Sequence, residues 1–304
     1  MHAVVFAYHD VGVNCLKAIL AAGIQVDLVI THQDDPNENV WFGSVAKLCV
    51  EKNIPYITPN ANELEDLIPK LRSLAPDYIF SFYYRFMIPV QILACAKIAA
   101  LNMHGSLLPK YRGRAPVNWA ILHGETETGA TLHIMEAKPD AGDIVGQAAV
   151  KIGPDETATD VFGKVSQAAV SVIRQALPSL MQGIVPRLPN NLQKGSYFGG
   201  RKPADGQIHW DQKAIQVHNL VRAVAPPYPG AFTNFRGQTM TVARTSLKGP
   251  FPANLDLGAQ GIQVVGVSGA KTWLVRWSCH TSLAPTLANN FWEKFACMAC
   301  LAVT

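Results

Sequence analysis

The sequence predicts an α/β protein with an open, mostly parallel sheet and a small C-terminal β-barrel. Short apolar runs alternate with patterns of helical period through the first half of the chain, which is the order of a parallel sheet with crossover helices. After residue 230 the pattern changes to short strand-like runs separated by turn residues, which is typical of a small barrel. With 304 residues, the chain fits one large domain or two smaller ones.

The predicted sheet begins with a strand–helix–strand unit. Residues 4–7 form its first strand and residues 26–30 its second, with a helix between them. The unit lacks the G-x-G-x-x-G pattern of dinucleotide sites. Its turn places His9 and Asp10 at the carboxyl end of a strand, where a helix-capping role and a substrate role both remain open.

The same patterns predict the other elements of the first half. In chain order we expect a polar loop at 31–38, a helix at 40–52, a short strand at 55–57, a helix at 64–74, strands at 78–82 and 98–101, a helix over 116–123, two antiparallel strands at 130–135 and 144–152, and a long helix from Thr157. Pro69 lacks the N–H that a continuous helix needs, so it must kink or restart the helix at 64–74.

A stretch rich in Pro, Gly, Asn and Lys at residues 186–206 predicts a linker, with the domain boundary near Pro203. The first domain would span residues 1–203 and the second residues 204–304. In the second we expect a helix around His218 and strands at 231–235, 239–244, 262–267 and 272–277. The tail from about residue 278 has no strand rhythm and is atypical of such a barrel.

The composition excludes several classes of protein. A formal net charge of +4 is small for this length, so the sequence gives no sign of a protein that coats nucleic acid. No apolar run could span a bilayer and the first residues lack a basic leader segment, so we expect a cytoplasmic protein without a membrane partner. Cys297 and Cys300 have no second pair at zinc spacing, and we expect no metal.

The stretch from Asn102 to Pro116 contains the best candidates for chemistry. It follows a buried strand, so Asn102 and His104 lie at the strand's carboxyl end, and alternation puts both side chains on one side. An imidazole with a near-neutral pKa can take a proton from an amine and return one to a leaving group. A carboxamide N–H beside it can stabilise an oxyanion. The pair therefore suits acyl transfer to an amine.

This stretch resembles the 10-formyltetrahydrofolate-dependent formyltransferases, whose signature is Asn-x-His followed by Ser-Leu-Leu-Pro. The chain has Asn102-Met103-His104 and then Ser106-Leu107-Leu108-Pro109. Asp140, in Lys138-Pro139-Asp140-Ala141-Gly142, is similar to the third catalytic residue of that family. The runs at 80–85 and 124–129 make the resemblance closest to the formyltransferase part of UDP-4-amino-4-deoxy-L-arabinose formyltransferases and to stand-alone sugar N-formyltransferases. It covers roughly residues 4–245.

The resemblance implies a Rossmann-like catalytic domain with an OB-like C-terminal subdomain. It implies that His104 is the general acid/base, that Asn102 stabilises the oxyanion, and that Asp140 orients His104 and raises its pKa. The donor would be 10-formyltetrahydrofolate, and no metal is needed because the donor is already activated. The implied folate-binding positions are Phe86, Met87, Ile88, Arg114, Glu136, Ala137, Lys138, Pro139 and Asp140.

The acceptor implied by the resemblance is a nucleotide-linked amino sugar, with UDP-4-amino-4-deoxy-L-arabinose first among the candidates. Arginine forks suit the oxygens of its diphosphate. The candidate residues are His9, Tyr84, Lys110, Tyr111 and Arg112, although Lys110 and Arg112 fit a solvated basic loop equally well. The context would be lipid A modification or polysaccharide biosynthesis, with no nucleic-acid partner. A homo-oligomer is compatible with the sequence.

Two other functions remain open. Methionyl-tRNA formyltransferases usually insert a basic, glycine-rich loop after the second strand, whereas residues 31–39 here are acidic and would repel a tRNA backbone. A folate-binding protein without turnover is the other alternative, because the atypical tail could spoil the acceptor site.

Overall fold

A computed structural model of the chain describes residues 1–34, 41–235, 238–247, 261–268 and 271–278. The predictions for residues 35–40 and for the tail after Ser278, including Cys297 and Cys300, fall outside these ranges. The chain forms two compact units. The first comprises Met1–Pro116, Glu127–Lys151 and Phe162–Gly199, and the second comprises Val117–Thr126, Ile152–Val161 and Gly200–Thr304.

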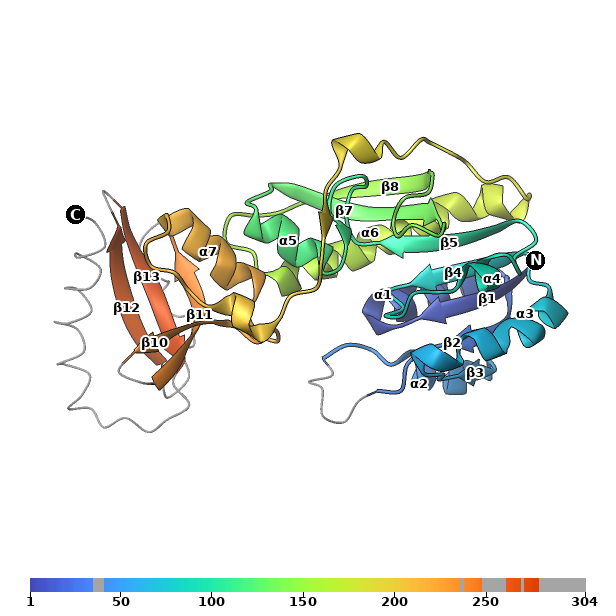
Figure 1. Cartoon of the computed structure of the whole chain (residues 1–304), viewed down its shortest axis with the longest axis horizontal. Helices are drawn as coiled ribbons and strands as arrows, with labels where there is room; N and C mark the ends of the chain where they lie inside the picture. Colours follow the sequence, from blue (N-terminus) through green and yellow to red (C-terminus); the bar gives the residue numbers. More distant parts are fainter. Residues whose placement is uncertain (35–40, 236–237, 248–260, 269–270, 279–304) are drawn as a thin grey trace. The chain divides into compact units, whose positions relative to one another are not determined.

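A seven-stranded sheet forms the centre of the first unit, in the order β3-β2-β1-β4-β5-β7-β8 (Figure 1). Its strands are β1 (His2–Ala7), β2 (Gln25–Ile30), β3 (Tyr56–Ile57), β4 (Tyr78–Phe82), β5 (Ala99–His104), β7 (Glu127–Ile134) and β8 (Ile144–Lys151). The strands from β3 to β5 pair in parallel, and β7 pairs antiparallel with both β5 and β8. The expected α/β class with a mostly parallel sheet is therefore confirmed.

Six helices accompany this sheet in the described residues, and a capping side chain or a proline explains where two of them begin. They are α1 (His9–Ala21), α2 (Val45–Lys52), α3 (Ile68–Leu74), α4 (Val90–Leu93), α5 (Pro116–Leu122) and α6 (Ala158–Met181). The expected start of α2 at residue 40 was wrong, because Ser44 caps the helix by accepting the N–H of Lys47. A new helix, α3, starts next to Pro69 as predicted, because Pro69 lies in its first turn, where a missing N–H is tolerated.

The two faces of the sheet bury different sets of side chains. One face forms an apolar cluster with the α3 and α4 region, and its members include Val4, Phe6, Leu28, Ile30, Ile79, Ile88 and Ala100. On the other face Tyr78, Phe80 and Phe82 stack along β4, and the Tyr78 hydroxyl donates to the Leu180 carbonyl of α6 at 2.8 Å. Because side chains alternate, Asn102 and His104 lie on the face of Ala100, away from α6.

The second unit contains α7 (Ala214–Ala223) and an antiparallel four-stranded sheet of order β10-β11-β13-β12 (Figure 1). The strands are β10 (Ala231–Phe235), β11 (Gln238–Ser246), β12 (Gly261–Ser268) and β13 (Lys271–Ser278), which confirms the four predicted strands. Helix α7 packs on β11. In the part of the chain that the structure describes, no helix has the length and apolar character needed to cross a membrane.

Candidate active site

Four polar side chains share one face of the sheet where β5 meets β7. Asn102 is paired with His133 across these antiparallel strands, and His104 is paired with Thr131. Residues that are opposite each other in antiparallel strands project to the same side, so the four form one polar patch. His104 is 6% exposed and His133 is 2% exposed. Both imidazoles are therefore almost fully removed from solvent.

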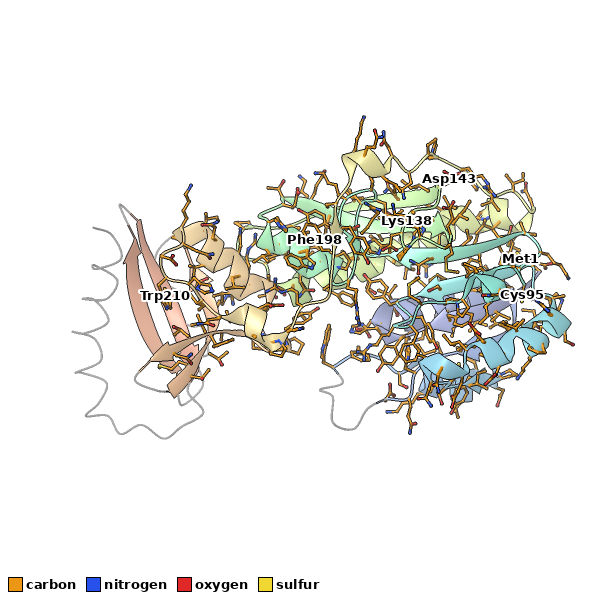
Figure 2. The ribbon with its side chains drawn as sticks, in the orientation of Figure 1. Met1, Cys95, Lys138, Asp143, Phe198 and Trp210 are labelled. Atoms are coloured by element: carbon orange, nitrogen blue, oxygen red, sulfur yellow. The ribbon has the colours of Figure 1, made fainter. Side chains whose placement is uncertain are left out.

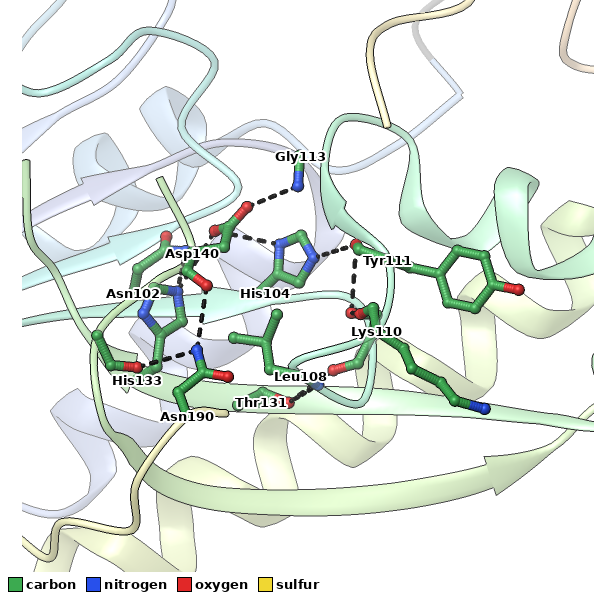
Figure 3. A network of polar contacts seen from close by, with 12 residues as sticks. Asn102, His104, Leu108, Lys110, Tyr111, Gly113, Thr131, His133, Asp140 and Asn190 are labelled. Atoms are coloured by element: carbon green, nitrogen blue, oxygen red, sulfur yellow. Dashed lines mark hydrogen bonds and ion pairs between the residues drawn. The ribbon is translucent and has the colours of Figure 1, made fainter. Parts of the chain in front are cut away.

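Asp140 joins this patch from the loop between β7 and β8, which Lys138 and Asp143 mark in Figure 2. Its Oδ1 lies 3.5 Å from His104 Nδ1 and 3.4 Å from His133 Nε2 (Figure 3). Its Oδ2 accepts the N–H of Gly113 at 2.8 Å. The carboxylate thus lies between the two imidazoles and is held by a backbone donor.

His104 is fixed in one tautomer by its neighbours. Its Nε2 lies 2.8 Å from the carbonyl of Tyr111, which can only accept, so Nε2 carries the hydrogen. In the neutral ring Nδ1 is then unprotonated and faces Asp140. Nδ1 is the atom that can take a proton, and the adjacent carboxylate would stabilise the resulting imidazolium.

The pKa values of this pair are shifted by burial and by each other. Burial lowers the pKa of His104 below its ordinary value, and the Asp140 carboxylate and the Tyr111 carbonyl only partly offset that effect. Burial would raise the pKa of Asp140, but His104, His133 and the Gly113 N–H hold it well below its usual range. Asp140 does act to raise the His104 pKa, as expected, although the net shift of His104 is downward.

His133 is a site residue that the sequence reasoning missed. Its Nδ1 lies 2.8 Å from the carbonyl of Ile134, so Nδ1 carries the hydrogen and Nε2 accepts the Asn102 Nδ2–H at 3.0 Å. His133 thereby orients the carboxamide of Asn102, which keeps a second N–H for another acceptor. The available signal was the alternation of polar Thr131 and His133 within an otherwise apolar strand.

The loop after β5 is tied to the sheet. The Thr131 hydroxyl donates to the carbonyl of Ser106 at 2.6 Å, and the Ser106 hydroxyl donates to the carbonyl of Lys110 at 2.6 Å. Gln147 of β8 donates to the Leu108 carbonyl at 2.8 Å. A Cβ at Gly105 would overlap the Tyr83 hydroxyl, so any larger residue here would displace that side chain. The loop is consequently ordered, as its glycine and proline content predicted.

Except for Arg114, which follows β6 (Arg112–Gly113), the residues predicted for folate binding lie on two loops that meet at the apolar cluster of the sheet. Phe86 and Ile88 belong to this cluster, and so does Met135, which precedes the loop of Glu136, Ala137, Lys138, Pro139 and Asp140. Met87 is 63% exposed, and Arg114, Glu136, Ala137 and Lys138 are exposed as well.

The residues predicted for acceptor binding are distributed over three environments. The His9 ring stacks on Phe42 with a 3.9 Å centroid distance and contacts Trp41 and Phe162 edge-on, while Tyr84 stacks on His32 at 4.3 Å. Lys110 is exposed. Tyr111 and Arg112 are buried, which excludes a solvated basic loop as the explanation of Arg112.

Arg112 has an uncommon environment for a buried guanidinium. It is 8% exposed, and its Nε and Nη1 have no hydrogen-bond partner within the described residues. Its guanidinium lies 5.9 Å from the ring of Tyr197. In the same described part of the chain, no group of three or more His, Cys, Asp or Glu side chains could hold a metal ion.

Two family models match the sequence of this chain. Residues 3–177 match the family model described as formyl transferase, and residues 201–267 match the model described as formyl transferase, C-terminal domain. The sugar 3N-formyl transferase WlaRD, solved with dTDP and 5-N-formyl-THF, superposes with a TM-score of 0.70 at 20% identity, covering 91% of this chain and 97% of WlaRD.

Two further solved structures share the fold. The N-formyltransferase from Helicobacter canadensis, in complex with folinic acid and dTDP-3-aminofucose, gives a TM-score of 0.66 at 22% identity over 91% of this chain and 98% of its own. The methionyl-tRNA formyltransferase from Clostridium thermocellum gives 0.57 at 18% identity over 82% and 94%. At these identities the structural likeness concerns the fold alone.

Proposed function

Because the chain belongs to the formyl transferase family, we propose that it transfers a formyl group from 10-formyltetrahydrofolate to the amine of a nucleotide-linked amino sugar. We propose UDP-4-amino-4-deoxy-L-arabinose as the acceptor. The observation that carries the proposal is the buried His104–Asp140 pair with the Asn102 carboxamide on the same face of the sheet. Such a pair suits proton transfer to and from nitrogen.

The proposed role of His104 follows from its tautomer. Nδ1 accepts the proton that the amine loses as the new C–N bond forms, and it returns a proton to the folate nitrogen as the old C–N bond breaks. Asp140 stabilises the intervening imidazolium at 3.5 Å. The second N–H of Asn102 donates to the oxyanion that develops on the formyl oxygen, while His133 holds the carboxamide in that orientation.

The donor is a substrate that this chain would hold between two loops. The apolar cluster that joins Phe86, Ile88 and Met135 supports a site for the pterin next to the loop of Asp140. Backbone groups of residues 86–88 and 136–140 would read its polar edges, and Arg114 would approach from the loop after β5. Two neighbours of known structure were solved with formylated folates, which supports this choice of donor.

The acceptor would lie on the side of Arg112 and His9. A buried guanidinium with unmatched donors favours an anion, and a diphosphate matches its fork geometry. The rings around His9 continue through Phe162 to Tyr83, whose hydroxyl borders Gly105 beside His104. We propose that these aromatic faces, with Tyr84, Lys110 and Tyr111, bind the amino sugar and its nucleotide.

The C-terminal part and the biological context belong to the same proposal. We propose an OB-like barrel for the C-terminal part. The antiparallel order β10-β11-β13-β12 supports four of the strands that such a barrel needs. Lipid A modification or polysaccharide biosynthesis would be the context of a formylated arabinose. Methionyl-tRNA formylation is the second candidate, because a methionyl-tRNA formyltransferase shares the fold.

A turnover assay tests the proposal directly. The purified chain is given 10-formyltetrahydrofolate with UDP- and dTDP-linked 4-amino and 3-amino sugars, and initiator methionyl-tRNA in a separate series. We expect one amino sugar to be formylated and His104→Ala to reduce kcat by about 10²–10⁴-fold, the range of general acid–base catalysis. The exposed His209 provides the matched control, His209→Ala, which should retain full activity.

Each other outcome has a definite meaning. Formylation of tRNA instead of any sugar would replace the first candidate with the second. Folate binding without turnover of any acceptor would identify the chain as a binding protein. Full activity of His104→Ala would remove His104 from the chemistry.

A further inference from the structure

Residues 188–198, here termed the connecting segment, lie between the two parts of the chain that match the family models at 3–177 and 201–267. Their composition predicted a linker. In the structure they belong to the first unit and form hydrogen bonds with the two loops that carry the partners of His104.

The first of these loops is the one that holds Asp140. Leu188 exchanges two backbone hydrogen bonds with Ile144, at 2.8 and 2.9 Å, at the end of this loop. Asn190 then donates its Nδ2 to the carbonyl of Asp140 at 3.1 Å and to that of Gly142 at 3.2 Å (Figure 3). The connecting segment therefore fixes the backbone on both sides of the Asp140 side chain.

Asp140 needs such support because its backbone is in the left-handed region, with φ of 51°. For a residue with a Cβ this conformation is unfavourable, and it persists where surrounding contacts determine it. The Asn190 bonds act on the Asp140 carbonyl, and the Gly113 N–H acts on its carboxylate. Without Asn190 the backbone half of this restraint would be lost.

The second loop is the one that follows β5. The Ser196 hydroxyl accepts the N–H of Tyr111 at 2.9 Å, and the Ser196 carbonyl accepts the N–H of Arg112 at 3.0 Å. Strand β9 (Tyr197–Phe198) pairs in parallel with β6 (Arg112–Gly113). The ring of Phe198 stacks on Tyr111 at 5.4 Å.

These contacts determine what His104 meets on each side. The Tyr111 carbonyl accepts from His104 Nε2, and the N–H of the same residue, Tyr111, donates to the Ser196 hydroxyl. The Gly113 N–H, which holds Asp140 Oδ2, lies in the strand paired with β9. One short segment thus anchors the groups at Nε2 and at Nδ1 of the same imidazole.

We propose that Asn190 and Ser196 are positioning residues, which hold the two loops so that Asp140 faces Nδ1 of His104 and the Tyr111 carbonyl faces Nε2. Neither residue contacts His104. The role rests on the proposed function only in that His104 carries out the proton transfer, and the geometry it describes can be measured without any acceptor.

The first test is NMR of the imidazoles in the full chain. The His104 signal is assigned by its loss in His104→Gln, and its titration is compared in wild type, Asn190→Ala and the matched control Asn191→Ala, whose side chain accepts only from the nearby Gln193 N–H. We expect the His104 pKa to be lower in Asn190→Ala, because a displaced carboxylate no longer favours the imidazolium. Asn191→Ala should titrate as wild type.

The other groups that face His104 must be considered in this titration. His133 disfavours the His104 imidazolium, and the Tyr111 carbonyl favours it. Neither contacts Asn190 directly, so a change confined to Asn190→Ala reports on Asp140. If the acceptor is in hand, kcat of Asn190→Ala should fall by about tenfold while both KM values stay within about twofold, equivalent to one lost hydrogen bond in the transition state.

Ser196→Ala provides a second test at the opposite side of the ring. We expect the imidazole ¹⁵N shifts of His104 to show loss of the uniform Nε2–H tautomer, whereas Ser73→Ala on the exposed surface of α3 changes nothing. If Asn190→Ala fails to fold, Ser196→Ala decides alone. A wild-type tautomer in Ser196→Ala, or a wild-type titration in folded Asn190→Ala, would overturn the proposal. If instead the proposed function is wrong, the variants would still show these altered spectra, but neither they nor the wild type would turn over any acceptor.

Discussion

Three features of its environment suit His104 to proton transfer. Burial keeps the ring neutral near pH 7, the Tyr111 carbonyl selects the Nε2–H tautomer, and the Asp140 carboxylate favours the protonated state once it forms. A solvated neutral histidine would instead interconvert between its two tautomers. The arrangement therefore prepares a single nitrogen, Nδ1, for the reaction.

Replacing Asp140 separates these contributions. In Asp140→Asn the Gly113 N–H keeps an acceptor, but the charge that favours the imidazolium is removed. The His104 pKa then falls further, so the acidic limb of the kcat–pH profile shifts to lower pH, and kcat falls by about 10²-fold or more. Steady-state kinetics between pH 5 and 9 would measure both effects.

Asp143→Asn serves as the control, since Asp143 is the same type of residue three positions further along the same loop. Its activity and pH profile should match those of the wild type. An Asp140→Asn enzyme with an unshifted acidic limb would mean that the carboxylate does not act on the group that titrates in turnover.

The sequence was informative about some residues of the site and silent about others. Asn102, His104 and Asp140 were found because their spacing resembles a known signature. His133, Asn190 and Ser196 were missed because their importance lies in one or two hydrogen bonds to backbone or amide groups that only the folded chain brings near. The alternation of Thr131 and His133 indicated only that one face of their strand is polar, and a polar residue in a loop gives no local sign of such a contact.

At the scale of elements, the site depends on how β4 and β5 are fixed against α6. The 24-residue helix α6 has apolar residues on one stripe, and Val161, Val165, Ile173 and Leu180 are fully buried or nearly so. The side chains of β4 that face it are the large rings of Tyr78, Phe80 and Phe82. This packing leaves the opposite face of β5 available for polar residues.

The contact between Tyr78 and α6 gives a stability prediction. Tyr78→Phe removes the hydroxyl that donates to the Leu180 carbonyl but keeps the buried ring. The free energy of unfolding should fall by about 1 kcal/mol, as for the loss of one buried hydrogen bond. Urea unfolding measures it, with Tyr56→Phe as the control because Tyr56 is 39% exposed.

Catalytic constants should be unchanged in Tyr78→Phe, because Tyr78 lies at the amino end of β4 and the site lies at the carboxyl end of β5. A loss of activity without a loss of stability would contradict this separation between packing and chemistry.

The boundaries of helices and strands were predicted well where the sequence pattern determines them. They were predicted poorly where one capping side chain determines them. The strands at 78–82 and 231–235 were located to the residue, because each begins directly after a turn signal, Pro76-Asp77 or Pro229-Gly230. Helix α2 begins at Val45 and not at residue 40, because the Ser44 side chain caps its first turn by accepting the N–H of Lys47. The turn expected at His9 and Asp10 is instead the first part of α1, and His9 has a positive φ of 65° at the helix start.

At the scale of the whole molecule, a buried polar network holds the second unit together. His218 is bonded to the Thr245 hydroxyl at 2.7 Å and to the Pro154 carbonyl at 2.9 Å, and Arg222 donates to the Gly153 carbonyl at 3.2 Å. The Pro154 carbonyl accepts from Nε2, so Nδ1 of the neutral ring accepts from Thr245. In a protonated His218 both ring nitrogens donate, so the Thr245 hydroxyl would have to turn and accept from Nδ1.

Stability should therefore depend on pH in a defined window. Burial is the main cause that holds the pKa values of His104 and His218 below 6.5, and for His218 Arg222 and Arg244 add to it while Pro154 and Asp155 oppose it. The unfolded chain then binds more protons, so the free energy of unfolding is fully present above about pH 6.5 and decreases as the pH falls below it.

Urea unfolding at pH 8, 7, 6 and 5 would measure this dependence. His218→Gln removes one titrating group and should show a shallower decrease than the wild type, whereas His209→Ala should follow the wild type. Equal slopes in all three proteins would mean that His218 does not have a depressed pKa in the folded state.

The division of the chain into units has a consequence for chimaeras. The backbone passes from one unit to the other five times, because the second unit takes in Val117–Thr126 and Ile152–Val161 as well as everything from Gly200 onward. Arg222 and His218 are bonded to carbonyls of residues 153 and 154, which lie in the stretch Ile152–Val161 and not in the continuous stretch from Gly200 onward. Exchanging only the stretch from Gly200 onward between homologues would therefore separate His218 and Arg222 from the carbonyls that they were selected to bind. A successful hybrid would need Val117–Thr126 and Ile152–Val161 to be exchanged as well.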